Sequence, residues 1–194
     1  MYTRMMEFYR LFLLFAVFPT RGTAASKILH TTLGPISGKT VSKTIDGGKV
    51  IQTDVYLGVP YAASTAGLNR FRSTQPRKPW TTTLSCSNYG PGCPQGDHNP
   101  DVPKNQSEDC LNLNIWKPTK VTNKQAMAIG IFFHGGAFKE GSNRGPFDLY
   151  DGAYFSARSG IIVIAANYRV GALGFLTSND AGSEGNYGIQ DHGI

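Results

Sequence analysis

Residues 129–138, Ile-Gly-Ile-Phe-Phe-His-Gly-Gly-Ala-Phe, constrain the fold of this chain more than any other stretch. The segment begins as an unbroken apolar run and stops at a His-Gly-Gly-Ala turn. A strand of a parallel sheet is buried on both faces, so its sequence is continuously apolar, and ligands collect where such strands end. The stretch therefore predicts a buried strand that carries a glycine loop to a functional edge of the sheet.

The glycine loop has the composition of an oxyanion hole, a set of N–H donors that stabilises a negatively charged tetrahedral intermediate. Gly135 and Gly136 allow the backbone to turn with its N–H groups outward, and no side chain keeps a reacting oxygen away. Tight turns use the same residues for geometry alone. Taken by itself, the loop leaves both interpretations open.

The flanking patterns predict an α/β fold. Residues 148–159 have the periodicity of a helix that stops at Gly160, and residues 161–166 form a second apolar, β-branched run. A strand, a helix and a strand in this succession form a βαβ unit, whose strands are parallel and whose crossover is right-handed. The sheet is therefore expected to be parallel around the glycine loop.

The part of the chain before the glycine loop predicts three further strands. Residues 32–41 and 50–61 have strand patterns and are joined by a hairpin turn at residues 46–48, Asp-Gly-Gly. Residues 111–116 alternate between apolar and polar side chains, as in a half-buried strand, and Pro118 ends this run. We expect this last strand to lie beside the central strand, which is the apolar run at residues 129–133 that leads to the glycine loop.

The N-terminal residues 1–25 have the pattern of a secretory signal peptide. Arginines precede an apolar run at residues 11–18, and small residues follow at 22–25. The run is far shorter than the roughly 20 residues that a membrane span needs, and no later stretch is long and apolar enough to cross a bilayer. We therefore expect a secreted protein, with a signal anchor as the minor alternative.

Charge and histidine placement argue against several functions. The net charge is +6, but Arg4, Arg10 and Arg21 against Glu7 put +2 of it in the leader, which leaves +4. The chain has no Lys/Arg run, so nucleic-acid binding is not expected. The histidines are scattered without the spacing of metal ligands, so we expect neither a metal nor a cofactor.

Four motifs together resemble the type B carboxylesterase and cholinesterase family. They are Glu-Asp-Cys-Leu-Asn-Leu-Asn at residues 108–114, His-Gly-Gly-Ala-Phe at 134–138, Asn-Tyr-Arg at 167–169 and Gly-Asn-Tyr-Gly at 185–188. The resemblance implies an α/β-hydrolase fold, of which residues 26–194 would be the N-terminal part. This part would contain the initial β-hairpin and then strands of a central mixed, mostly parallel sheet with a crossover helix. The family resemblance also implies hydrolysis of small carboxylic esters.

The resemblance assigns roles to the glycine loop. Gly136 and Ala137 would supply the N–H donors of the oxyanion hole, and Gly135 would allow the turn. Phe138 would form a wall of the acyl pocket. His134 would brace the loop through hydrogen bonds rather than act as a base. Arg169, in the Asn-Tyr-Arg motif, is expected in a structural ion pair.

The three cysteines allow one disulfide with one residue left over. Cys93 and Cys110 flank a polar segment of Ω-loop length, and closing such a loop contributes about 3 kcal/mol in the chain-entropy model. The resemblance also implies this pair. Cys86 then has three possible states, namely a buried free thiol, a partner beyond residue 194, or a link between two molecules.

Two further features fall near this disulfide. The resemblance implies that Arg70 pairs with Glu108, whereas the sequence alone would leave both charges solvated. Asn105 begins an Asn-Gln-Ser sequon in the disulfide loop, which is a glycosylation site if the chain enters the secretory route.

The remaining parts of an esterase site are absent from the sequence. Covalent ester hydrolysis needs a nucleophile, a base and an orienting acid besides the oxyanion donors. The 194 residues contain no Gly-x-Ser-x-Gly elbow, and the family order would place that elbow after Ile194. We therefore expect the N-terminal part of a larger esterase, or a truncated product, that is inactive alone. With a sheet strand lacking its neighbour, the isolated chain should be poorly soluble or only partly folded.

Two functional alternatives remain open. The first is a secreted serine carboxylesterase, favoured over a choline esterase because residues 94–109 lack the tryptophan that binds choline in the family. The second is a non-catalytic, neuroligin-type adhesion protein that keeps the fold without the nucleophile. The residue between the two glycines of the elbow would distinguish them.

Overall fold

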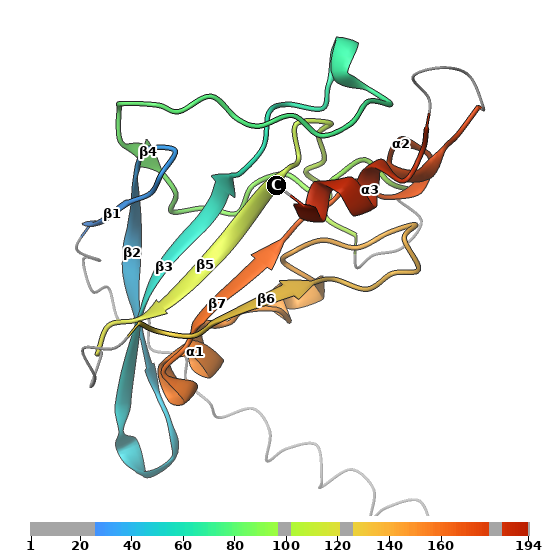
Figure 1. Cartoon of the computed structure of the whole chain (residues 1–194). Coiled ribbons are helices and arrows are strands. Elements are labelled where there is room, and N and C mark those ends of the chain that lie inside the picture. Colours follow the sequence, from blue (N-terminus) through green and yellow to red (C-terminus); the bar gives the residue numbers. More distant parts are fainter. Residues whose placement is uncertain (1–25, 97–101, 121–125, 179–183, 194) are drawn as a thin grey trace, which may run out of the picture.

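A computed structural model describes residues 26–96, 102–120, 126–178 and 184–193. The predicted signal peptide lies outside these residues. The described chain forms a seven-stranded sheet with short helices around it (Figure 1). The strands are β1 Ser26–His30, β2 Pro35–Thr44, β3 Val50–Pro60, β4 Leu84–Ser85, β5 Asn112–Pro118, β6 Ile129–Phe133 and β7 Ile162–Ala166. The α-helices are α1 Ala153–Ser159, α2 Gly171–Phe175 and α3 Tyr187–Gln190, and 3₁₀ turns span Asp46–Gly48, Gly67–Asn69, Pro146–Asp148 and Asp191–Gly193.

The predicted hairpin is confirmed. β2 and β3 pair antiparallel and are joined by the 3₁₀ turn Asp46–Gly48 (Figure 1). β2 begins and ends three residues later than predicted, because Thr31 and Gly34 close a separate turn through reciprocal backbone hydrogen bonds of 3.2 Å. The hairpin is the one that the α/β-hydrolase resemblance implies, and the unpredicted strand β1 precedes it and pairs antiparallel with β2.

The βαβ unit is also confirmed, with a shorter helix than expected. β6 and β7 pair parallel, and α1 between them packs against β3, β5 and β7. The predicted helix began at residue 148, but α1 begins at Ala153. Phe147 and Asp148 have left-handed backbone angles, with φ of 50° and 58°, which an α-helix of L-residues excludes. The helix ends as predicted at Gly160, whose φ is 74°.

The sheet differs from the prediction in two respects. Its described pairings are mostly antiparallel, since β1–β2, β2–β3, β3–β5 and β5–β7 are antiparallel and only β2–β4 and β6–β7 are parallel. Strands β5 and β6 are not neighbours, because β7 lies between them. The sequence indicates that a helix connects β6 to β7, but it does not show which strands β7 lies between.

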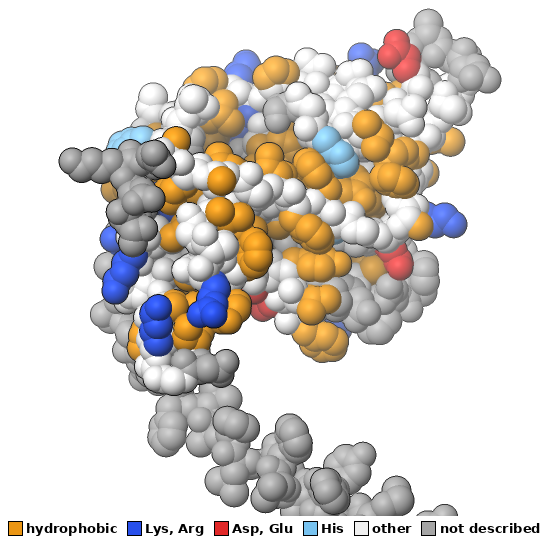
Figure 2. All heavy atoms as spheres, turned by 60° about the horizontal axis from the view of Figure 1, so that its bottom comes forward, with side chains coloured by type: hydrophobic (Ala, Val, Ile, Leu, Met, Phe, Trp, Pro, Cys, Tyr) orange, Lys and Arg blue, Asp and Glu red, His pale blue; other side chains and the backbone are white. Residues whose placement is uncertain are grey.

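Strand β6, which was predicted to be a buried central strand, is more exposed than expected. It is an edge strand of the described sheet, paired only with β7. Ile131 is 59% exposed, and Phe132 and Phe133 are each 39% exposed. Hydrophobic side chains are visible over much of the molecular face shown in Figure 2. The described residues therefore leave the apolar side chains of β6 partly uncovered.

The buried core lies around β2, β3 and β5. Trp116 of β5 is 1% exposed and packs with Val55 of β3 and Ala153 of α1. Cys86 is 2% exposed and packs with Ile36 and Tyr56 as a free thiol, and burial raises the pKa of this thiol. Within the described residues, Cys86 is therefore a buried free thiol.

Candidate functional site

The glycine loop follows β6 directly and folds into a tight turn. The carbonyl oxygen of Gly136 accepts hydrogen bonds from the N–H groups of Lys139 at 2.9 Å and Glu140 at 3.2 Å. The turn is left-handed, with φ of 117° at Gly136, 52° at Ala137 and 61° at Phe138. In the described part of the chain, the N–H groups of Gly136 and Ala137 have no hydrogen-bond acceptor. The two amides expected to bind the oxyanion are therefore available as donors.

The need for glycine lies at Gly136 rather than at Gly135, where we expected it. A Cβ atom on Gly136 would stand 1.9 Å from the carbonyl oxygen of Glu140. At Gly135, an added Cβ would meet no atom within 4 Å, and φ is not positive. The turn itself therefore tolerates a side chain at position 135, and that side chain would point into open space.

A hollow of about 470 Å³ opens beside the two available amides. Its lining combines Gly136, Ala137, Lys139 and Glu140 of the glycine loop with Gly96 of the disulfide loop. The Phe138 ring does not line it. That ring packs instead against Phe175 of α2, with 5.2 Å between ring centroids. The hollow is large enough to admit part of a small ester next to the donors.

His134 is held as a structural brace. Its side chain is 4% exposed, and its ring stacks on Tyr168 with 4.4 Å between centroids. Its Nδ1 lies 2.9 Å from the Gly135 carbonyl oxygen, and the Tyr168 hydroxyl donates to the His134 carbonyl oxygen at 2.8 Å. Because a carbonyl oxygen can only accept, Nδ1 carries the proton. Burial lowers the pKa of His134 and so favours the neutral imidazole, in which this bond selects the tautomer with the proton on Nδ1.

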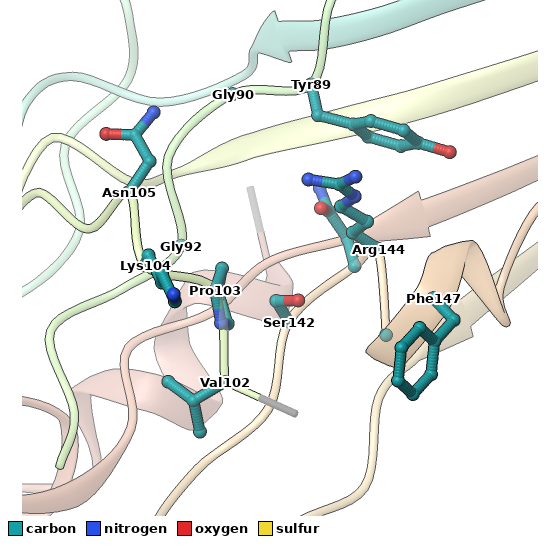
Figure 3. Close-up of a pocket in the computed structure, with 12 residues that line it drawn as sticks. Tyr89, Gly90, Gly92, Val102, Pro103, Lys104, Asn105, Ser142, Arg144 and Phe147 are labelled. Carbon is teal, nitrogen blue, oxygen red and sulfur yellow. The ribbon is translucent and has the colours of Figure 1, made fainter. Parts of the chain in front are cut away.

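The predicted disulfide between Cys93 and Cys110 is confirmed, with 4.9 Å between the Cα atoms. It closes the loop that carries Gly96 and Asn105. Asn105 is exposed, and it lies on the rim of a second cavity of about 490 Å³ together with Lys104, Ser142 and Arg144 (Figure 3). None of the loop residues 134–138 lines this larger cavity. The larger cavity is therefore separate from the candidate oxyanion hole.

Arg70 and Glu108 lie as a bidentate pair. The Arg70 Nε and Nη2 groups donate to the two carboxylate oxygens of Glu108 at 2.8 and 2.5 Å. The Arg70 side chain is 48% exposed and the Glu108 side chain 24%, so the pair lies at the surface with its carboxylate partly buried. Thr65 also donates to the Glu108 carbonyl oxygen. The pair therefore ties the disulfide loop to the segment before it.

Arg169 makes the structural ion pair expected of it, and the structure identifies the partner as Asp191. The Arg169 Nη2 and Nε groups lie 2.8 and 2.9 Å from the Asp191 carboxylate oxygens, and both side chains are almost fully buried. Thr74 also donates to Asp191. The pair fastens the turn Asp191–Gly193 beside the end of β7. Sequence reasoning missed Asp191, because the sequence does not show that Arg169 is buried and therefore needs a charge partner.

Gln95 is a second residue that sequence reasoning missed. Its side-chain amide hydrogen-bonds with the backbone of Gly141, at the far end of the glycine loop. A lone glutamine in a polar loop carries no sequence signal, because its importance depends on which backbone lies opposite it.

The described residues contain no helix long and apolar enough to span a membrane. They also contain no cluster of three or more potential metal ligands.

Comparison with known proteins defines the class to which this arrangement belongs. The model of the carboxylesterase family matches residues 25–193, and the chain belongs to this family. It is 35% identical to liver carboxylesterase 1F of Rattus norvegicus, in an alignment of 176 positions that covers 84% of this chain and 30% of that protein. It is 30% identical to neuroligin-2 of Mus musculus, in a gapped alignment of 204 positions that covers 84% of this chain and 23% of that protein.

The fold agrees with the family assignment. The solved structure of a thermophilic pNB esterase matches with a TM-score of 0.70 and 32% identity, over 86% of this chain and 33% of that one. The predicted α/β-hydrolase fold is thereby confirmed. The chain spans between 23% and 33% of the length of the relatives named here.

Proposed function

We propose that the complete protein is a secreted serine carboxylesterase and that this part of it supplies the oxyanion hole. The single observation that carries the proposal is the placement of two free amides, those of Gly136 and Ala137, beside a hollow at the end of β6. The substrate would be a small neutral carboxylic ester. Family membership supports the reaction class.

The geometry supports one step of ester hydrolysis. When a serine oxygen attacks the ester carbonyl carbon, the carbonyl oxygen becomes an oxyanion, and two N–H donors stabilise it until the alcohol leaves. Gly136 and Ala137 would be those donors. His134 and Tyr168 would hold the turn in place, and neither would move a proton in the reaction.

The nucleophile must come from another part of the family fold. These 194 residues contain no Gly-x-Ser-x-Gly elbow. We therefore expect these residues alone, or a truncated product limited to them, to hydrolyse no ester. The serine, acid and histidine would belong to the part of the family's length that these residues do not span.

Secretion and glycosylation are part of the proposal. The leader pattern at residues 1–25 and the disulfide Cys93–Cys110 both fit a protein of the secretory route, where disulfides form and persist. The exposed Asn105 would then carry a glycan. No cofactor, metal or nucleic acid has a role in this mechanism.

The second candidate function is adhesion of the neuroligin type, and the match to neuroligin-2 favours it. Against it stands the glycine loop, because a protein released from catalysis has no chemical reason to keep two amides free beside a hollow. The esterase proposal accounts for this loop, and the adhesion proposal does not.

Replacing one backbone donor tests the proposal most sharply. Ala137→lactic acid, introduced by nonsense suppression into the full-length protein, removes the N–H group and keeps the methyl side chain. Loss of one oxyanion donor should lower kcat for a p-nitrophenyl ester by about 100- to 1,000-fold with little change in KM. Ala172→lactic acid is the matched control, since Ala172 lies in the first turn of α2, where N–H groups have no helical acceptor. Equal kcat values in the two variants would contradict the assigned donor.

A further inference from the structure

Within the described residues, the side chain of Gln95 joins the disulfide loop to the glycine loop. The Gly141 N–H group donates to Gln95 Oε1 at 2.6 Å, and Gln95 Nε2 donates to the Gly141 carbonyl oxygen at 2.8 Å. A primary amide is the side-chain group that can donate and accept in parallel in this way. The pair copies the reciprocal hydrogen bonding of two peptide groups in a sheet.

Gln95 is itself fixed from several sides. Its backbone N–H donates to Gln106 Oε1 at 2.8 Å, and its Nε2 also donates to the Cys93 carbonyl oxygen at 2.9 Å. It stands two residues after Cys93, which is bonded to Cys110. A side chain on a covalently closed loop with these bonds is a rigid support rather than a mobile surface group.

Gly141 lies directly behind the oxyanion turn. Its φ is 118°, and a Cβ atom placed on it would stand 2.4 Å from His134 Nδ1 and 2.5 Å from the Gly135 carbonyl oxygen. The Gly141 backbone therefore contacts the same carbonyl group that His134 Nδ1 approaches. A displacement of Gly141 would change the space available to the Gly135 carbonyl group. It would therefore change the direction in which the N–H groups of Gly136 and Ala137 point.

We propose that Gln95 is a positioning residue, which fixes the direction of the Gly136 and Ala137 amides by clamping Gly141. This inference rests on the proposed function, because it assigns Gln95 a role in the same oxyanion hole. Gln95 does not line the hollow beside these amides, so it would act through the backbone of residues 134–141. The disulfide Cys93–Cys110 contributes by holding the clamp in place.

The first part of the test measures the clamp without requiring activity. Amide hydrogen exchange is followed in residues 134–141 of the purified full-length protein, at single-residue resolution. Gln95→Ala should lower the protection of the Gly141 amide at least tenfold. Gln52→Ala is the matched control, because Gln52 is an exposed glutamine on the β2–β3 hairpin whose Nε2 bonds only Ser42. It should leave protection of the loop unchanged.

A charge variant separates the two-way hydrogen bond from simple packing. In Gln95→Glu, an ionised carboxylate can accept from the Gly141 N–H but cannot donate to the Gly141 carbonyl oxygen. Protonation of the introduced carboxylate restores a donor to the Gly141 carbonyl oxygen. The protection of the Gly141 amide, relative to wild type at the same pH, should therefore recover as pH falls toward the glutamate pKa of about 4.3. A merely space-filling role would show no such recovery. This variant also serves if Gln95→Ala does not fold.

The second part of the test connects the clamp to chemistry. With a p-nitrophenyl ester, Gln95→Ala should lower kcat at least tenfold with little change in KM, since a misplaced oxyanion donor affects the transition state more than binding. Unchanged protection at Gly141, or unchanged kcat despite lost protection, would overturn the inference. If wild type hydrolyses no ester while Gln95→Ala still loses protection, the clamp stands and the proposed function fails.

Discussion

Gly135 and Gly136 are adjacent glycines with very different surroundings. A methyl group fits at position 135, whereas at position 136 it would collide with the Glu140 carbonyl oxygen in a left-handed turn. We expect Gly136→Ala to lower the free energy of unfolding by about 1–3 kcal/mol or more, the range for a strained non-glycine backbone. Gly135→Ala should change it by less than about 0.5 kcal/mol.

Urea denaturation of the two variants side by side measures this difference. Both substitutions add one methyl group to the same loop, so each controls for the other. Equal destabilisation would mean that the turn does not have the described left-handed geometry. If Gly135→Ala folds normally but loses ester hydrolysis, the open space in front of Gly135 would be the space that substrate occupies.

His134 gives the protein a predictable pH dependence. Burial lowers its pKa in the folded state below the ordinary value, and burial does the same for His192. The unfolded chain therefore binds more protons than the folded chain once pH falls below about 6.5. The stability contributed by the neutral imidazoles is complete above that pH, and it is lost as pH falls through the lowered folded-state pKa values.

Denaturation midpoints measured between pH 7.5 and pH 5 test this sign. The free energy of unfolding should decrease toward pH 5 in wild type. In His134→Gln the overall stability should be lower, but its decrease with falling pH should be shallower. A steeper decrease in the variant would contradict the assignment of a depressed His134 pKa.

At the scale of elements, strand β6 combines a sheet edge with an apolar sequence. Ile131 is 59% exposed on this edge, in the described part of the chain. Unpaired backbone groups beside apolar side chains promote pairing between molecules. Residues 26–194 expressed alone should therefore associate, and Ile131→Lys should reduce light scattering at equal concentration.

Leu68→Lys is the control for added charge, because Leu68 is 91% exposed in the turn Gly67–Asn69, outside the sheet. It should leave the association of residues 26–194 nearly unchanged. A cooperative unfolding transition of a monomeric wild-type product would contradict the prediction.

The elements also show what sequence alone can predict. Apolar periodicity located β6 and β7, and the Asp-Gly-Gly turn located the β2–β3 hairpin, because these features depend on neighbouring residues. The helix start was wrong by five residues, since Phe147 and Asp148 adopt left-handed backbone angles, which are rare for a bulky residue such as Phe147. Gln95, Asp191 and the place of β7 between β5 and β6 depend on contacts distant in sequence, which local patterns do not encode.

At the scale of the whole molecule, the described residues form a support for one glycine loop. β6 brings the loop to the sheet edge, His134 and Tyr168 brace its start, and Gln95 holds its end at Gly141. The disulfide loop contributes both Gln95 and a wall of the hollow. The proposed site is nonetheless partial, because these residues would supply oxyanion donors and contain no Gly-x-Ser-x-Gly elbow.

Covalent labelling of the purified full-length protein with a fluorophosphonate tests the central claim most directly. This probe bonds to an activated serine of a hydrolase and needs an oxyanion hole to react efficiently. We predict one label per molecule, located by peptide mapping on a serine flanked by the glycines of a Gly-x-Ser-x-Gly elbow. A folded full-length protein that takes up no label would contradict the esterase assignment and favour the adhesion function.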